Sequence, residues 1–470
     1  MKPEFNLFCP GNPRLHPCRC KAALKLFQRF YGRQPYEFAP LRPEDQVTFC
    51  IRKTYIFQGP KTAWKTMVQD KIFRLKGKVQ HYAWGGHAFI PQWLGTQSVD
   101  NQPCAEYWMG AHPSAASVLE TNGTEVSLLQ LIQQQPEEAI GAAVWNRFGE
   151  LPYLFKILDV KDMLSIQVHP SKAEAEKGYD AEEAAGVPVN APHRNYKDRN
   201  HKPEVMIALS EFWLLHGFLQ PDLLRKVLRS VPAFSELAPL FDKEGYKGLY
   251  QHVMEMPQAQ VNALLTPLVL AECQKYEAGQ LNRSQPGWWV AKLCANQKLL
   301  GNVDRGIFSV YFFNIVQVQP GEAVFQGAGV PHAYLEGQNV ELMANSDNVL
   351  RGGLTPKHVD VPELLKHTIF EGITPVIMKG DAAGNGERLY PCPVPDFGIS
   401  KIELQPGEKW NHITDSLEIL VVMNGSATIT GNGSVTVEKG QAAAVLAGEP
   451  YVLQAGSPLL VYRAFVPRLA

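Results

Sequence analysis

The feature that most constrains the fold of this chain is an outline that occurs twice. Gly321–His332 and Gly440–Tyr451 each read as a strand, a tight turn and a second strand, with the same separation of 11 residues between first and last. Both copies keep two glycines and a proline just before the final residue. Short strands joined by glycine turns are typical of β-barrels and β-sandwiches. We infer an internal duplication of a β-domain, with coincidence between two glycine turns as the alternative.

The two copies differ at their final residue. The first copy ends in His332, whose imidazole can bind a metal, whereas the second ends in Tyr451. The second copy still contains His412 and Glu418. We therefore expect a metal site in the first copy only, and a C-terminal copy that packs against the first and braces it.

Further metal-capable residues lie upstream of the first copy. Gln167 and His169 alternate along the apolar run Leu164–Pro170, so on a strand both side chains emerge on one side. Glu204 begins another apolar run. With His332 these residues make a set of two imidazoles, one carboxylate and one amide oxygen, which suits zinc or a similar divalent ion. A single histidine is more often a core or surface residue, so the whole set carries the prediction.

Cationic residues accompany this set. Lys202 shares a strand face with Glu204, whereas His201 points away. Pro203 cannot donate a ladder hydrogen bond, so this strand end is expected at an edge or rim. Arg351 precedes two glycines, a setting in which a guanidinium can enter a cramped site for an anion. A solvated surface segment is the alternative for Arg351.

Composition limits the function classes. The chain has 470 residues, of which 45% are hydrophobic and 19% charged, as in globular proteins of two or three domains. Its net charge of -1 favours neither nucleic acid nor a membrane as partner. The cysteines are scattered, which indicates reduced thiols, and no apolar run is long enough to span a membrane. We expect a cytoplasmic protein.

The pattern along the chain suggests the following domains. They are a poorly structured extension over 1–66, a catalytic β-domain over 67–217 and 306–390, a helical insert over 218–305, and the degenerate copy over 391–470. Met67 is the expected native start. Helix is predicted over Leu129–Phe148, strand from Gly306 to Val318, and a turn over 336–339. Trp84 and Trp108 lie between glycines, and we leave open whether they pack on the core or form a wall for a sugar.

Six segments together resemble one known family, the type I phosphomannose isomerases, zinc enzymes that interconvert mannose 6-phosphate and fructose 6-phosphate. The segments are Gln80–Gly85, Ala105–Pro113, Ser165–Pro170, Asn200–Glu204, Val330–Tyr334 and Glu341–Lys357. The resemblance covers roughly residues 71–470. It implies a mainly β fold with α-helices, in which two cupin-type jelly-roll barrels accompany an inserted helical domain. Gly327 stands where the second cupin motif usually has proline, and a special backbone is expected there.

The resemblance also implies residue roles. The zinc ligands, for one Zn²⁺ per chain, would be Gln167, His169, Glu204 and His332. The catalytic arginine would be Arg351. Residues lining the sugar-phosphate pocket would be Ser165, Trp84, Lys202, Tyr334, Glu341, Asp347 and Lys357. A cytoplasmic monomer acting in carbohydrate metabolism, in the supply of GDP-mannose, is expected.

The implied reaction moves a proton between C2 and C1 of the sugar through a cis-enediol. Zinc can take up charge on the sugar oxygens as a Lewis acid, and Arg351 can add a permanently charged donor. Lys202 is our hypothesis for the base, because a neighbouring cation favours loss of its proton. His201 and Glu341 are the rivals. Lys357 is the weaker hypothesis for a phosphate contact.

Two other function classes remain. A non-catalytic sugar-binding cupin would need no metal beside a proton carrier. An iron cupin oxygenase would favour two histidines and a carboxylate with open positions, whereas the neutral Gln167 fits Lewis-acid zinc better.

Overall fold

The computed structural model describes residues 46–51, 55–60, 70–96, 101–121, 124–296 and 301–468. The chain divides into two units, Met1–Asp70 and Lys71–Ala470. In the first unit β1 (Gln46–Ile51) and β2 (Tyr55–Pro60) pair antiparallel. The predicted poor structure of 1–66 otherwise falls outside the described residues, as does Met67.

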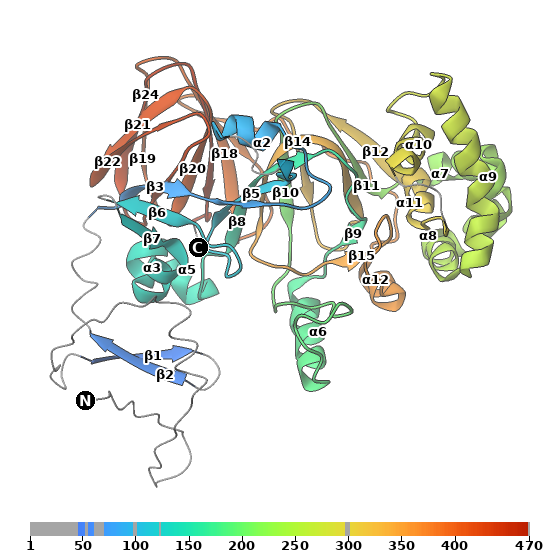
Figure 1. Cartoon of the computed structure of the whole chain (residues 1–470), viewed down its shortest axis with the longest axis horizontal. Coiled ribbons are helices and arrows are strands. Elements are labelled where there is room, and N and C mark those ends of the chain that lie inside the picture. The colour runs from blue at the N-terminus through green and yellow to red at the C-terminus, as the bar shows by residue number, and fades with distance from the viewer. Residues whose placement is uncertain are drawn as a thin grey trace, which may run out of the picture. The chain divides into compact units, whose positions relative to one another are not determined.

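The second unit is mainly β with helices, as predicted (Figure 1). A ten-stranded sheet has the strand order β12-β11-β14-β8-β5-β4, with four further strands attached. Its strands are β4 (Lys78–Gln80), β5 (Glu106–Gly110), β8 (Tyr153–Val160), β9 (Gln167–Val168), β10 (Glu204–Ala208), β11 (Phe212–Phe218), β12 (Phe313–Val318), β13 (Ala323–Gln326), β14 (His332–Ala344) and β15 (Leu350–Arg351). Four of these strands, β5, β8, β10 and β11, are buried along their full length, which explains their largely apolar sequences.

The C-terminal strands form two more sheets. The nine-stranded sheet contains β3 (Ile72–Lys76), β6 (Val118–Thr121), β7 (Thr124–Ser127), β16 (Asp381–Gly384), β17 (Glu387–Tyr390), β18 (Gly398–Leu404), β20 (Glu418–Asn424), β23 (Ala442–Val445) and β25 (Leu459–Phe465). The four-stranded sheet contains β19 (Lys409–Ile413), β21 (Ser426–Gly431), β22 (Gly433–Glu438) and β24 (Pro450–Ala455). Because β3 pairs with β23, an early strand completes the sheet of the C-terminal copy.

Short helices connect the strands. They are α2 (Phe89–Trp93), α3 (Leu128–Gln134), α4 (Pro136–Ile140), α5 (Ala142–Phe148), α6 (Lys172–Ala184) and α12 (Val361–His367). The helix predicted over Leu129–Phe148 is thus three helices, because Pro136 starts a new one and Gly141, with φ +88°, separates the next. Among the described helices, none combines the length and the apolar character needed to cross a membrane.

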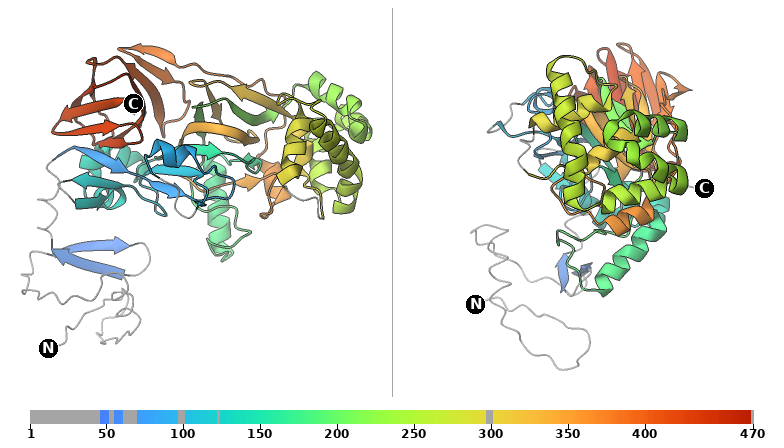
Figure 2. Two further views of the ribbon diagram at one scale, coloured as in Figure 1. Left: turned by 45° about the horizontal axis from the view of Figure 1, so that its top comes forward. Right: turned by 90° about the vertical axis from the view of Figure 1, so that its right-hand side faces the viewer.

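The longest helical stretch lies between β11 and β12. It comprises α7 (Pro221–Ser230), the 3-10 helix η3 (Pro232–Leu237), α8 (Ala238–Glu255), α9 (Gln258–Glu277), α10 (Pro286–Asn296) and α11 (Gly306–Phe312). We call these elements the helical segment. They gather at one end of the second unit, with the C-terminal strands at the other (Figure 2). The predicted strand from Gly306 to Val318 is therefore wrong over Gly306–Phe312. Every residue of α11 is buried, so packing overrides the β-propensity of its aromatic and branched residues.

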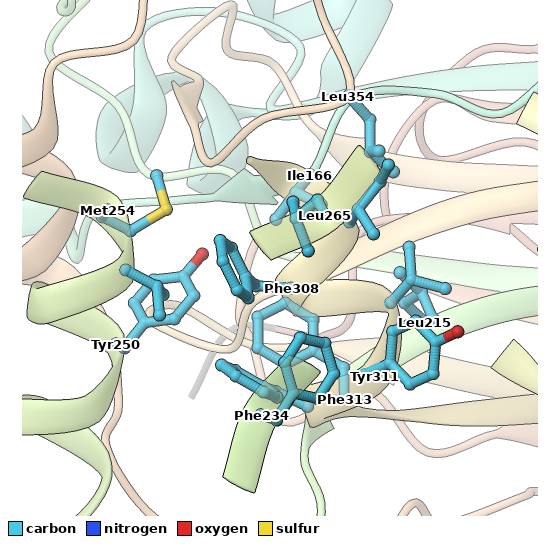
Figure 3. Close-up of a cluster of buried hydrophobic side chains, with 14 of the residues drawn as sticks. Ile166, Leu215, Phe234, Tyr250, Met254, Leu265, Phe308, Tyr311, Phe313 and Leu354 are labelled. Atoms are coloured by element: carbon cyan, nitrogen blue, oxygen red, sulfur yellow. The ribbon is translucent and has the colours of Figure 1, made fainter. Parts of the chain in front are cut away.

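An apolar cluster joins the helical segment to the ten-stranded sheet (Figure 3). Phe234, Tyr250 and Phe308 come from the helical segment, while Ile166 precedes β9 and Leu354 follows β15. Burial of large side chains of this kind is worth about 1.5–3 kcal/mol each. The cluster therefore fixes the helical segment against the strands that carry Gln167 and Arg351.

The turn predicted over 336–339 is wrong, since β14 runs unbroken from His332 to Ala344. β14 pairs with β11 in its first half and with β8 in its second half. Gly337 permits this change of partner with a φ of +130°. A Cβ at Gly337 would lie 2.7 Å from both the Glu211 carbonyl oxygen and the Phe212 ring. Glycine thus marks a bend within a strand here.

The duplicated outline is confirmed in the backbone. β13 and the start of β14 form the first copy, and β23 and β24 form the second. The glycines kept in both copies have matching left-handed φ values, +84° at Gly321 and +87° at Gly440, +79° at Gly329 and +71° at Gly448. Gly327 has no positive φ, so the special backbone expected at this residue is wrong.

Candidate metal centre

Three of the four predicted metal ligands converge in the interior of the second unit. His169 follows β9, Glu204 starts β10 and His332 starts β14. Their ligand atoms all lie within 4.8 Å of one another, and all three side chains are buried. The strands that carry them are neighbours, because β14 pairs with both β9 and β10. Sheet register therefore brings together residues that are far apart in sequence.

Each imidazole is oriented by a backbone carbonyl. His169 Nδ1 lies 2.8 Å from the Asn348 carbonyl oxygen, and His332 Nδ1 lies 2.9 Å from that of Val330. A carbonyl oxygen only accepts, so each Nδ1 must carry a hydrogen, and each Nε2 is the ring nitrogen that lies near Glu204. His169 Nε2 is buried and has no hydrogen-bond partner. Such an orphaned lone pair, with the other ring nitrogen fixed, is how metal-binding histidines are held.

The protonation states also fit a cation. Burial lowers the pKa of His169 to about 4, so its ring is neutral at neutral pH. Burial alone would raise the pKa of Glu204, but Lys202 and the two histidines hold it well below its ordinary value. His332 Nε2 lies 3.2 Å from Glu204 Oε2. Imidazole nitrogens and a carboxylate oxygen are donors that zinc prefers.

Gln167, the fourth predicted ligand, lies on the strand next to His332. Its backbone pairs with His332 on one side and with Arg351 on the other. Its side chain is half-buried, as are those of Arg351 and Ser165. Burial lowers the pKa of the Arg351 guanidinium. The short strand pair β9–β15 thus places the predicted arginine next to the predicted amide ligand.

Lys202 and His201 face opposite ways, as the alternation predicts. Lys202 Nζ lies 2.9 Å from Glu204 Oε1. His201 Nε2 instead lies 3.0 Å from both oxygens of Asp396, a buried residue just before β18. His201 therefore ties the start of β10 to the C-terminal strands.

Lys156 and Glu106 belong to the centre although the sequence analysis did not name them. Lys156 Nζ lies 3.1 Å from Glu341 Oε2 and 3.5 Å from Glu106 Oε2. Burial alone would lower the pKa of Lys156, but these two carboxylates raise it. The signal available in the sequence was a lysine within the mainly apolar run of β8, which also contains Asp159.

Tyr334 and Trp108 complete the hydrogen bonds of this buried cluster. The Tyr334 hydroxyl donates to Glu341 Oε1 over 2.7 Å, and the Trp108 indole donates to Glu106. Burial raises the pKa of Glu341, with Lys156 opposing. Lys156 Nζ also lies 5.2 Å from the centroid of the Trp108 ring. This buried tryptophan therefore contacts the charged cluster and does not form an open wall for a sugar.

The charges of the cluster favour binding of a cation. Three buried carboxylates, Glu106, Glu204 and Glu341, face two ammonium groups, Lys156 and Lys202. When all five are ionised their sum is -1, and one divalent ion would change it to +1. A net negative charge in a low-dielectric interior attracts a cation, so this cluster favours a bound metal ion.

The remaining predicted pocket residues lie nearer the surface. Asp347 Oδ2 is 3.3 Å from His112 Nε2, and its side chain is half-exposed. Burial alone would raise the pKa of Asp347, but His112 lowers it. Lys357 is exposed, and partial burial together with Arg351 lowers its pKa. Trp84 is half-buried and stacks on Tyr82 with ring centroids 5.8 Å apart.

The C-terminal strands carry a second polar cluster at the same register positions. With the two copies aligned, the strand pairs relate Gln167 to His412, Glu204 to Glu418, Glu341 to Arg463, Lys156 to Ser400 and Glu106 to Glu387. Lys156 of the first cluster is on β8, whereas the cation of the second cluster, Arg463, is on β25.

Arg463 occupies the centre of this second cluster. Its guanidinium lies 2.7 Å from Glu418 Oε1 and 2.8 Å from Glu387 Oε1. The Tyr451 hydroxyl donates to Glu418 Oε2 over 2.8 Å, and His412 Nε2 lies 3.0 Å from Glu418 Oε1. A side chain of the protein itself therefore supplies the positive charge between these carboxylates.

Comparison with known proteins agrees with this geometry. A model of the phosphomannose isomerase type I catalytic domain matches residues 72–221. Mannose-6-phosphate isomerase of Escherichia coli is 38% identical over 362 residues, covering 76% of this chain and 90% of that protein. The human protein of the same name is 34% identical over 392 residues, covering 77% and 89%.

Solved structures agree as well. A point mutant of phosphomannose isomerase from Salmonella typhimurium superposes with a TM-score of 0.76 at 33% identity, covering 85% of this chain and 100% of that one. A mannose 6-phosphate isomerase from the same organism, bound to fructose 6-phosphate and zinc, gives 0.74 at 34% identity, with 84% and 99% covered. The chain therefore belongs to the type I phosphomannose isomerase family.

Proposed function

We propose that this protein is a zinc-dependent isomerase that interconverts mannose 6-phosphate and fructose 6-phosphate. The observation that carries the proposal is the buried convergence of His169, Glu204 and His332, in which the Nε2 atoms of both imidazoles face the carboxylate. The relatives named above act as support, since they carry this activity in their names and one binds fructose 6-phosphate and zinc.

One Zn²⁺ per chain would be held by Gln167, His169, Glu204 and His332. When bound, the ion supplies a Lewis acid that favours charge on a sugar oxygen. Arg351 lies beside Gln167 on β15 and supplies a second, permanent positive charge toward that oxygen. Lys202, on the face of Glu204, holds and moves the proton between C2 and C1.

The contacts of the rival bases favour Lys202. His201 is held by Asp396 on the opposite side of the strand. Both carboxylate oxygens of Glu341 already accept hydrogen bonds, from Tyr334 and Lys156. Lys202 Nζ is also paired, with Glu204 Oε1 over 2.9 Å, but this pairing directs it to the side of the metal ligands.

The predicted pocket residues lie at different depths below the protein surface. Tyr334 and Glu341 lie in the interior and would set the shape of the pocket, while Ser165 and Trp84 border it. Asp347 would bind sugar hydroxyls. Lys357 is exposed near Arg351 and would bind the phosphate.

We further propose that the fold consists of two cupin-type jelly rolls and an inserted helical domain. One apolar core draws residues from both the nine-stranded and the four-stranded sheet, as two layers of a jelly roll do. The strand pair β21–β22 is joined by a tight turn at Asn432, whereas the corresponding pair β11–β12 is separated by the helical segment. This comparison supports an insertion at that turn, with the predicted domain limits 67–217 and 306–390, 218–305, and 391–470.

The C-terminal copy is proposed to bind no metal, because Arg463 takes the place of a cation there. Metal analysis of the purified protein is expected to give one zinc per chain. A second zinc, lost on His412→Ala, would contradict this proposal. We also propose that the protein is a cytoplasmic monomer and that it contributes to the supply of GDP-mannose.

The decisive experiment combines metal analysis with a coupled assay. We expect one zinc per chain and formation of fructose 6-phosphate from mannose 6-phosphate, both lost together on chelation and restored by zinc. A sugar-binding protein without catalysis would bind mannose 6-phosphate and release no product. An iron oxygenase would contain iron and consume oxygen. Either of these results would overturn the proposed function.

A further inference from the structure

Arg351 lies in a strand of only two residues, so neighbouring segments must fix its position. On one side the segment joins the ligand strand, because Arg351 pairs with Gln167 and the Gly352 N–H donates to the Ile166 carbonyl over 2.9 Å. The Ile166 N–H in turn donates to the Gly353 carbonyl over 3.1 Å.

On the other side the segment is held by Asp304, at the end of the helical segment. Asp304 Oδ1 accepts from the Leu354 N–H over 2.9 Å, and Oδ2 accepts from the Thr355 N–H over 3.0 Å. Oδ1 also accepts from the Gly306 N–H, 2.7 Å away, at the start of α11. Both oxygens of this carboxylate are thus bonded to backbone on two separate segments.

The backbone held by Asp304 has an unfavourable conformation. Leu354 has φ +54°, which is uncommon for a branched residue with a Cβ. Such strain persists only where surrounding contacts enforce it. Two of those contacts are the hydrogen bonds to Asp304 and the burial of the Leu354 side chain in the cluster of Figure 3.

The segment has no spare room. A Cβ at Gly353 would lie 2.6 Å from the Gly306 Cα, and one at Gly352 would lie 2.9 Å from the Ile166 side chain and 3.0 Å from the Tyr250 hydroxyl. The two glycines after Arg351 are therefore pressed between the ligand strand and the helical segment.

The Arg351 side chain depends on this backbone. Among the described residues no carboxylate forms an ion pair with its guanidinium, and the lowering of its pKa comes from burial alone. Its direction is thus set by the main chain from which it projects.

We propose that Asp304 is a positioning residue, which fixes Arg351 relative to the metal ligands by holding the backbone of Leu354 and Thr355. The helical segment contributes to catalysis through this carboxylate. The inference rests on the proposed function, in which Arg351 contacts the reacting sugar.

The first test compares Asp304→Ala with Asp304→Asn, which keeps one acceptor oxygen, in the full-length zinc enzyme. A displacement of about 1 Å can cost about 100-fold in rate. We expect kcat to fall about 10- to 100-fold for the alanine variant and less for the asparagine variant. KM is expected to change less than about threefold, and zinc to stay at one per chain.

Asp242→Ala is the matched control. Asp242 also belongs to the helical segment, where its carboxylate binds Arg225 and Arg229, and removing it weakens that segment without touching Leu354. We expect unchanged kcat. An equal fall in both variants would show a general effect of the helical segment and overturn the inference.

A double-mutant cycle with Arg351→Ala gives the sharper test. If Asp304 acts through Arg351, the double variant has the kcat of Arg351→Ala alone. Multiplied losses would overturn the inference. A loss that excess zinc restores would overturn it too, because Asp304 would then act through the metal.

A readout independent of turnover separates this inference from the proposed function. Amide hydrogen exchange at Leu354 and Thr355 should accelerate in Asp304→Ala and not in Arg351→Ala. Unchanged exchange would overturn the positioning role. An inactive wild-type enzyme with normal protection at these amides would refute the proposed function alone.

Discussion

Single buried side chains balance the charges of the metal centre. Lys156 is shared by Glu106 and Glu341, and Lys202 by Glu204. Removal of one partner from such a buried pair leaves an uncompensated charge and is strongly destabilising. The same proximity lowers the pKa of Glu204, so the carboxylate remains ionised and able to bind a cation.

For Arg351→Ala we expect kcat to fall about 10²- to 10³-fold with little change in KM, because a donor that acts on developing charge is lost. Arg351→Lys keeps a charge without the planar guanidinium and should be intermediate. Steady-state kinetics with measured zinc content test this. A defect confined to KM would argue against the role.

For Lys202→Met we expect loss of solvent-deuterium incorporation at C2 and a fall in kcat of about 10²- to 10⁴-fold. Zinc content should stay at one per chain. Lys379→Met, which removes an exposed lysine, is the control and should have no effect. Undiminished deuterium incorporation in Lys202→Met would eliminate this lysine as the base.

His216 gives a pH prediction. It pairs in register with His332, and burial, with a smaller effect of His332, lowers its pKa to about 4. The unfolded state therefore binds more protons between about pH 6.5 and 4, and stability falls as pH drops through this window. We expect the free energy of unfolding of zinc-free protein to fall by about 2 kcal/mol less in His216→Gln than in wild type when the pH is lowered from 7 to 5. Denaturant unfolding at the two pH values measures this difference. Equal losses would refute this.

At the scale of elements, short strands do most of the positioning. β9 and β15 have two residues each, yet they carry Gln167 and Arg351. They are stable only because β14 and the helical segment enclose them. The long strand β14 supplies this support by pairing with four other strands in turn.

Gly337→Ala tests the bend that allows β14 to change partners. The new Cβ would meet the Glu211 carbonyl and the Phe212 ring at 2.7 Å in a left-handed conformation. We expect a loss of about 1–3 kcal/mol in the free energy of unfolding. Gly327→Ala is the control, because its nearest contact is 3.7 Å away and its φ is not positive. Similar losses in the two variants would contradict this account of the bend.

At the scale of the whole molecule, the two copies each contain a buried cluster of carboxylates, but the cation beside the carboxylates differs. One cluster of carboxylates is suited to a metal ion, whereas the other holds Arg463.

Arg463→Met should therefore destabilise the protein by about 3–5 kcal/mol, because Glu418 and Glu387 would lose the cation that lies between them. Arg463→Lys should lose less. Denaturant unfolding of zinc-loaded protein measures both effects. An unchanged free energy of unfolding in the methionine variant would show that Arg463 does not stabilise this copy.

The sequence by itself determined the metal-capable residues and part of the element pattern. Strand alternation placed Gln167 beside His169 and Lys202 beside Glu204, and matching glycines revealed the duplicated turns. These features depend on local period and backbone conformation, which neighbouring residues encode. The helical stretch and the mainly β class follow from the same kind of pattern.

Only the tertiary structure decided what lies between distant segments. It made Gly306–Phe312 a helix by complete burial, and it carried β14 through Gly337 by exchange of partner strands. It also brought Lys156 and Glu106 into the centre and joined Asp304 to the backbone after Arg351. Burial, strand register and ion pairing across long sequence separations have no local signal, so these arrangements arise only when the chain is folded.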